Sequence, residues 1–216
     1  MGILAHRLIC GGQECPPYNK TNENKMIQEA YKALLAKEYD KALELYTALE
    51  AQKEPTSYYY LGFLYFKGHG VVQDTKRAYE YYLEAATREV PVAQFEVALM
   101  LENGEGCEKN ESEAAFWYEE SAKRGNIDAF NNLGAIFKEG RGVEQDYKKA
   151  FILFSKAANA NNAKAQFNLG ALYDTGLGCE EDKEKSIEWC RKAAFQGHEM
   201  AKGIIKRMQN DGQIVF

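Results

Sequence analysis

The sequence has no apolar run long enough to cross a bilayer, although 45% of its 216 residues are hydrophobic. It also has no excess of basic residues, because 27 Lys and Arg against 32 Asp and Glu give a formal net charge of −5. An acidic chain offers little electrostatic attraction to nucleic acids or to anionic membrane surfaces. We therefore expect neither nucleic-acid binding nor membrane insertion.

Histidine and cysteine, two residues on which much catalysis and metal binding depend, are scarce, with three His and five Cys. His69 and His198 fall in predicted loops, and no histidine has a catalytic spacing from a cysteine or carboxylate. His6, Cys10 and Cys15 match no usual zinc-binding spacing, and a fourth ligand is missing nearby. The sequence therefore predicts no catalytic residues, no metal, no cofactor and no enzymatic activity.

Nothing at the start of the chain has the pattern of a secretory signal, because residues 1–10 lack a sustained apolar core and an obvious cleavage site. An odd number of irregularly spaced cysteines also favours a reducing compartment. We expect a cytoplasmic protein, and keep secretion as an effector as the alternative.

What the sequence does contain is a 36-residue pattern that recurs four times between residues 55 and 196 without insertion or deletion. A fixed period of this length is typical of a solenoid. A Gly-x-Gly loop and a capping Asp or Asn recur in all four copies, and a Leu-Gly pair and an Ala-Ala pair recur in the first, third and fourth. In the fourth copy these are Leu169-Gly170, Gly176-x-Gly178, Asp182 and Ala193-Ala194.

Each copy predicts two helices joined by the Gly-x-Gly loop, whose glycines supply positive φ at the end of the first helix. An N-cap residue then begins the second helix; these are Asp74, Asn110, Asp146 and Asp182. A glycine inside a helix costs about 1 kcal/mol relative to alanine. Gly62, Gly134 and Gly170 therefore predict close approach of a neighbouring helix.

The flanking segments have other patterns. Residues 1–22 are rich in turn formers and predict a mobile leader, and residues 23–52 predict a capping helical hairpin. Residues 197–210 predict a polar capping helix, because a terminal repeat has no neighbour on one side. Residues 211–216 are expected to leave the array as a tail. A single solenoid over residues 23–210 follows.

The repeated motif resembles the Sel-1-like repeat, a relative of the tetratricopeptide repeat, over about residues 55–200. The hairpin at residues 23–52 resembles a tetratricopeptide unit, with Tyr39-Asp40-x-Ala42 opening its second helix. The resemblance implies an all-α fold, a right-handed α/α superhelical solenoid, that acts as a non-enzymatic scaffold or adaptor for a protein or peptide.

Within that class the role could lie in signalling, complex assembly or virulence. The resemblance implies a bacterial protein. The alternative is an inhibitor or immunity-type protein that neutralises a toxin or enzyme. A distant third is a hydrolase like the cysteine-rich branch of the family, described as binding β-lactams. The regular cysteine pairs of that branch are missing here, so its activity is not transferred. Instead Cys107, Cys179 and Cys190 occupy positions of apolar residues and predict small core residues.

By the same resemblance, the partner binds a concave groove lined by the first helix of each repeat. Its exposed positions lie two residues before the Leu and two and five after it, with edge positions one residue before the Leu. The predicted groove residues are Tyr59, Tyr60, Phe63, Phe66, Phe95, Glu96, Leu99, Glu102, Asn131, Asn132, Lys138, Phe167, Asn168 and Asp174, joined by the small residues Ala135 and Ala171.

The aromatic residues of this set suit a buried binding hot spot, and the asparagines could hydrogen-bond an extended peptide. Two alternatives stay open. Tyr58, Tyr59 and Tyr60 could simply pack on the capping hairpin, and Asn132 and Asn168 could reflect a habit of the family. Self-association through the aromatics of the first repeat is also left open.

Overall fold

The computed structural model describes residues 9–10, 13–14 and 25–210 of the chain. Two short strands, β1 (Ile9–Cys10) and β2 (Gln13–Glu14), pair antiparallel, with Ile9 opposite Glu14. Apart from these strands, the predicted leader at 1–22 and the predicted tail at 211–216 lie outside the described residues.

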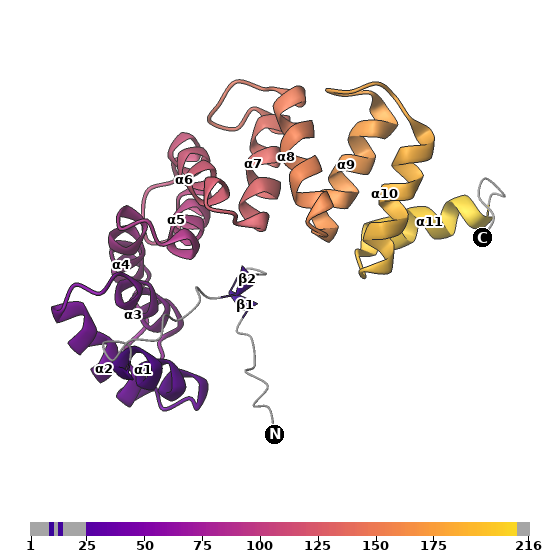
Figure 1. Ribbon diagram of the computed structural model, residues 1–216. Coiled ribbons are helices and arrows are strands. Elements are labelled where there is room, and N and C mark those ends of the chain that lie inside the picture. The colour runs from indigo at the N-terminus through magenta and orange to yellow at the C-terminus, as the bar shows by residue number, and fades with distance from the viewer. Residues whose placement is uncertain (1–8, 11–12, 15–24, 211–216) are drawn as a thin grey trace. The chain divides into compact units, whose positions relative to one another are not determined.

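Between residues 25 and 210 the chain is a succession of helices (Figure 1). This part of the chain confirms the predicted all-α solenoid fold of helix-turn-helix repeats. The helices are α1 (Lys25–Leu35), α2 (Tyr39–Ala51), α3 (Pro55–Lys67), α4 (Thr75–Thr87), α5 (Pro91–Asn103), α6 (Glu111–Lys123), α7 (Ile127–Glu139), α8 (Tyr147–Asn159), α9 (Ala163–Thr175), α10 (Lys183–Phe195) and α11 (Glu199–Asn210).

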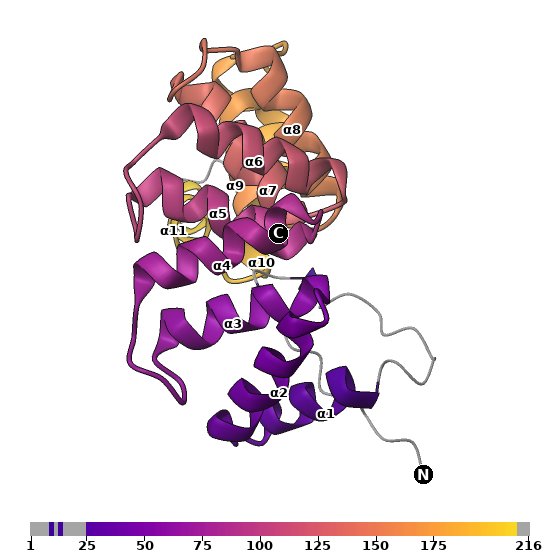
Figure 2. The same ribbon diagram turned by 90° about the vertical axis from the view of Figure 1, so that its left-hand side faces the viewer.

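The chain forms two compact units, Met1–Asn126 and Ile127–Phe216, which divide it between the second and third repeats. In the first unit each helix packs against the next, and Figure 2 shows α3, α4, α5 and α6 as successive layers. In the second unit α7 packs on α8, α8 on α9, α9 on α10 and α10 on α11. None of the described helices combines the length and the apolar character needed to cross a bilayer.

The ends of the helices follow the predicted local chemistry. Gly68 ends α3 in the left-handed conformation at φ 67°, and the Asp74 side chain begins α4 by accepting from the Arg77 amide at 2.9 Å. Asn110, Asp146 and Asp182 cap their helices in the same way. The prediction of four capped second helices is confirmed.

The predicted reason for the mid-helix glycines is also confirmed. A Cβ added at Gly62 would lie 2.7 Å from the Tyr82 ring, and one at Gly134 would lie 2.8 Å from the Phe154 ring. At Gly170 the nearest atoms are Cys190 Sγ and the Ser186 carbonyl oxygen, both 3.1 Å away. Glycine therefore allows the second helix of a repeat to lie directly against the first.

Candidate functional site

The predicted positions two residues before the Leu are mostly buried. Tyr59 is 3%, Phe95 7% and Asn131 6% exposed. The two aromatics pack against the second helix of their own repeat, with ring centroids 5.6 Å apart both for Tyr59 and Tyr82 and for Phe95 and Tyr118. The expectation that these positions are exposed is wrong for the first three repeats, and only Phe167 is half-exposed.

Tyr60 is buried by the capping hairpin. Its ring stacks on Tyr46 at 4.7 Å and lies 6.0 Å from Tyr31. These contacts bear out the alternative interpretation, in which Tyr60 packs on the capping hairpin. The hairpin covers the face of α3 that carries this side chain. Tyr60 is therefore buried, and the prediction that it lies at the edge of the groove is wrong.

The positions two and five residues after the Leu keep more of their surface. Phe63, Phe66, Leu99, Glu102 and Lys138 are half-buried, as is the edge residue Glu96, and Asp174 is exposed. The Glu102 carboxylate accepts a hydrogen bond from the Tyr118 hydroxyl at 2.6 Å. These positions form the accessible part of the first-helix face in each unit.

The three predicted asparagines of the second unit bond to one another. Asn168 Nδ2 donates to Asn131 Oδ1 at 3.1 Å, and Asn131 Nδ2 donates to Asn132 Oδ1 at 3.1 Å. The chain of amides joins α9 to α7, so these groups hold neighbouring repeats together.

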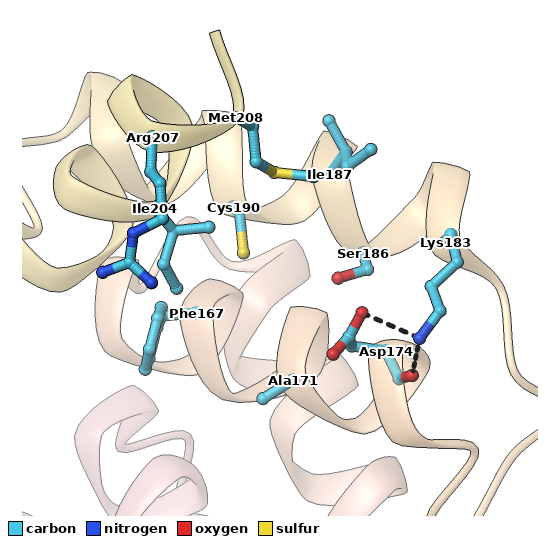
Figure 3. A pocket seen from close by; sticks show the side chains of 10 residues that line it. All are labelled: Phe167, Ala171, Asp174, Lys183, Ser186, Ile187, Cys190, Ile204, Arg207 and Met208. Atoms are coloured by element: carbon cyan, nitrogen blue, oxygen red, sulfur yellow. Dashed lines mark hydrogen bonds and ion pairs between the residues drawn. The ribbon is translucent and has the colours of Figure 1, made fainter. Parts of the chain in front are cut away.

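A pocket of about 310 Å³ opens between α9, α10 and α11 in the second unit (Figure 3). From α9 it is lined by Phe167, Ala171 and Asp174, three positions of the predicted first-helix face. The other lining residues are Lys183, Ser186, Ile187 and Cys190 of α10 and Ile204, Arg207 and Met208 of α11. Most of this lining is apolar.

Charged groups lie at two sides of the pocket. Lys183 Nζ pairs with the Asp174 carboxylate at 3.1 Å and with Glu181 at 3.1 Å, and hydrogen bonds to these two acids raise the pKa of Lys183. The Arg207 side chain lies on the other side, beside Phe167 and Ile204 (Figure 3), and pairs with no acid among the described residues. Among the residues that the structure describes, Arg207 therefore has no acidic partner at the pocket.

The small side chains at the back of the pocket come from α10. Ser186 is 7% and Cys190 6% exposed, and burial raises the pKa of the Cys190 thiol. Cys190 is a small buried residue, as expected, whereas Cys107 and Cys179 are half-buried thiols. Within residues 25–210, no three His, Cys, Asp or Glu side chains converge as a metal site would require.

Sequence reasoning found the α9 side of this pocket and missed the rest. The signal for the α10 side was the difference in side-chain size within the repeat register, since Cys190 aligns with the much larger Tyr82, Tyr118 and Phe154. A small residue at an aromatic position indicates unfilled volume. The contribution of α11 could not be found this way, because its residues depart from the repeat.

Comparison with known families agrees with this geometry. A family model described as the Sel1 repeat matches residues 55–89, 91–126, 127–162 and 163–198. The chain belongs to the Sel1 repeat family. Sel1 repeats form scaffolds that mediate protein interactions, and Sel1 repeat proteins are generally non-enzymatic.

Solved structures show the same solenoid fold. A Sel1 repeat protein from Oxalobacter formigenes is 30% identical with a TM-score of 0.78, over 84% of this chain and 74% of that one. A protective antigen of uropathogenic Escherichia coli, c5321, has a TM-score of 0.80 at 23% identity over 89% of this chain. The chain spans only 43% of the length of that protein.

A more distant match is the immunity protein Pa5087 from Pseudomonas aeruginosa. It is 21% identical with a TM-score of 0.51, over 86% of this chain and 70% of that one, which shows a common fold alone. A search of curated proteins found no match.

Proposed function

We propose that this Sel1 repeat protein is a non-enzymatic scaffold that binds a protein or peptide partner on the first-helix faces of its repeats. The observation that carries the proposal is the pocket between α9, α10 and α11, which combines mostly apolar walls with Arg207, an arginine that pairs with no acid within residues 25–210. An apolar pocket with a few convergent polar groups is the usual form of a binding site.

The rigidity of the surrounding helices supports this function. Phe167 and Ala171 project from α9, whose core side is locked by the buried Leu169 and Leu172 and whose N-terminus is capped by Asn162. A preorganised surface loses little conformational entropy when a partner binds. The role is thus recognition by a fixed shape. We propose that the protein acts in the cytoplasm, as expected from the sequence.

Affinity capture from the lysate of the source organism tests the proposal. Ala171→Glu places a charge in the exposed wall of the pocket, and Ile152→Glu places the same charge on α8, at a side chain that is 54% exposed. We expect one stoichiometric partner with the wild type and with Ile152→Glu, and its loss with Ala171→Glu. A partner retained equally by all three proteins, or no partner with any, would overturn the proposed site.

Inhibition of a toxin or enzyme is a special case of partner binding. The likeness to the Pseudomonas aeruginosa immunity protein supports only the fold. The identity of the captured partner therefore decides between inhibition and assembly. If the partner is an enzyme whose turnover falls when the purified protein is added at equal concentration, the role is inhibition rather than assembly.

A further inference from the structure

The pocket lies where the other repeats hold an aromatic ring of their own. The α10 position occupied by Cys190 is filled by Tyr82, Tyr118 and Phe154 in the first three repeats, and all three rings are buried. The facing glycine is nevertheless retained as Gly170. The fourth repeat thus keeps the glycine that admits a ring in the first and third repeats, while its own side chain is only a thiol.

The contacts of the second repeat show what such a ring would touch. Tyr118 packs edge-on against Phe95 and donates its hydroxyl to Glu102. By the 36-residue register, Phe167 and Asp174 are the counterparts of Phe95 and Glu102 in the fourth repeat. Both counterparts line the pocket, together with Cys190 (Figure 3). The pocket therefore presents the surroundings of a tyrosine side chain without the tyrosine.

Two further features define the ligand. The pocket volume of about 310 Å³ is at the lower end of the range for ligand pockets, and it has room for one large side chain. Arg207, uncompensated within residues 25–210, favours a carboxylate beside that side chain.

From these contacts we infer that the pocket binds a tyrosine side chain of an acidic segment of the partner, with its ring on Phe167 and Cys190, its hydroxyl on Asp174 and an adjacent carboxylate on Arg207. This inference rests on the proposed function and specifies the chemistry of the partner. The Asp174 carboxylate can accept the hydroxyl while it pairs with Lys183, because two carboxylate oxygens offer about four acceptor positions.

The first experiment uses 4-methylphenol, the side chain of tyrosine, as the probe. Titration into the full-length ¹⁵N-labelled protein should give saturable shifts of amides in α9, α10 and α11. Because the assay needs no partner, its failure is distinguishable from failure of the capture experiment. A wild-type protein with no saturable shifts would overturn the inference.

Variants that fill the pocket test its position. Cys190→Tyr fills it from the core, as in the first two repeats, and Ala171→Trp covers it from the surface without altering a buried residue. Each should weaken 4-methylphenol binding at least about tenfold, whereas Ile152→Trp on α8 should leave it unchanged. If Cys190→Tyr does not fold, Ala171→Trp decides. Equal binding by wild type and Ala171→Trp would refute the site.

Two dipeptides test the charges. Acetyl-Asp-Tyr-amide should bind about threefold more tightly than acetyl-Lys-Tyr-amide, as expected for an exposed ion pair. Arg207→Gln should remove that preference, and Asp174→Ala should remove a preference for acetyl-Asp-Tyr-amide over acetyl-Asp-Phe-amide. Preferences that survive both substitutions would contradict the assignment.

A last variant tests whether the occupant belongs to this chain. Residues 214–216 read Ile-Val-Phe. If Ile214→Ser combined with Phe216→Ser tightens 4-methylphenol binding several-fold, the chain's own segment competes for the pocket, and the partner's tyrosine is not its occupant. Unchanged binding in this double variant supports the partner.

Discussion

Asn168 Nδ2 donates to Asn131 Oδ1 at 3.1 Å, a hydrogen bond between two side chains 37 residues apart in the sequence. It links the first helices of the third and fourth repeats, α7 and α9. Because Asn131 is buried, its oxygen would lose a partner if Asn168 were removed, without gaining full access to water.

We therefore expect Asn168→Ala to lower the free energy of unfolding by about 1–3 kcal/mol, measured by urea denaturation. Asn159→Ala, at an exposed position at the end of α8, is the control and should change it by less than about 0.5 kcal/mol. Equal effects of the two substitutions would mean that the amide pair contributes nothing to stability.

Alanine substitutions at two mid-helix glycines should change the free energy of unfolding in opposite directions. Gly134→Ala places a methyl group against the buried Phe154 ring, and we expect the free energy of unfolding to fall by about 1–3 kcal/mol. Gly203→Ala in α11 meets no atom within 4 Å and should raise it by about 0.5–1 kcal/mol through helix propensity. Thermal denaturation measures both, and stabilisation by Gly134→Ala would disprove the close approach.

The glycine loops differ in what surrounds them. Gly178 has φ +77°, and a Cβ there would lie 2.2 Å from the Tyr147 carbonyl oxygen, whereas Gly197 has φ +93° and meets only Lys202 Nζ at 3.9 Å. Gly197→Ala should lower the free energy of unfolding by about 1–2 kcal/mol, the cost of holding an alanine at positive φ without a steric clash. Gly178→Ala should lower it clearly more in the same urea measurement. A matching loss at both positions would show that the loop can move away from α8.

Two carboxylates, Asp128 and Asp182, should contribute to the pH dependence of stability with opposite signs. Burial raises the pKa of Asp128 above 3.8, although Asn162 donates to this carboxylate at 2.7 Å and opposes the shift. The folded state then binds the proton more tightly than the unfolded state, so this group makes the protein more stable as pH falls through its folded pKa. The stability of wild type relative to Asp128→Asn should therefore rise on acidification from pH 7 to pH 3.

Asp182 supplies the opposite case within the same unit. Hydrogen bonds from the Lys185 side chain and backbone amide hold its pKa below 3.8. Its contribution is complete above its unfolded pKa and is lost as pH falls through the lower folded value. The stability of wild type relative to Asp182→Asn should therefore fall on acidification to pH 2.5, and a rise would contradict the assigned hydrogen bonds.

Local structure was largely predictable, because the local signals agree with one another. The Leu-Gly pair, the Gly-x-Gly loop and the capping Asp or Asn recur in phase, and the helices begin and end where these residues place them. Burial was less predictable. Tyr59 and Phe95 hold positions that are exposed in the related tetratricopeptide array, yet each packs on an aromatic of its own second helix.

The repeat, its helices, their caps and the membership of the Sel1 family all follow from the amino-acid sequence, since they depend on residues close together in the chain or in register. The packed structure was needed to show which side chains of the first helices are accessible. It also showed that Ile204, Arg207 and Met208 of α11 close a pocket with α9 and α10. Accessibility and cavity volume depend on the side chains of neighbouring helices together, and α11 follows no repeat pattern from which its contacts could be predicted.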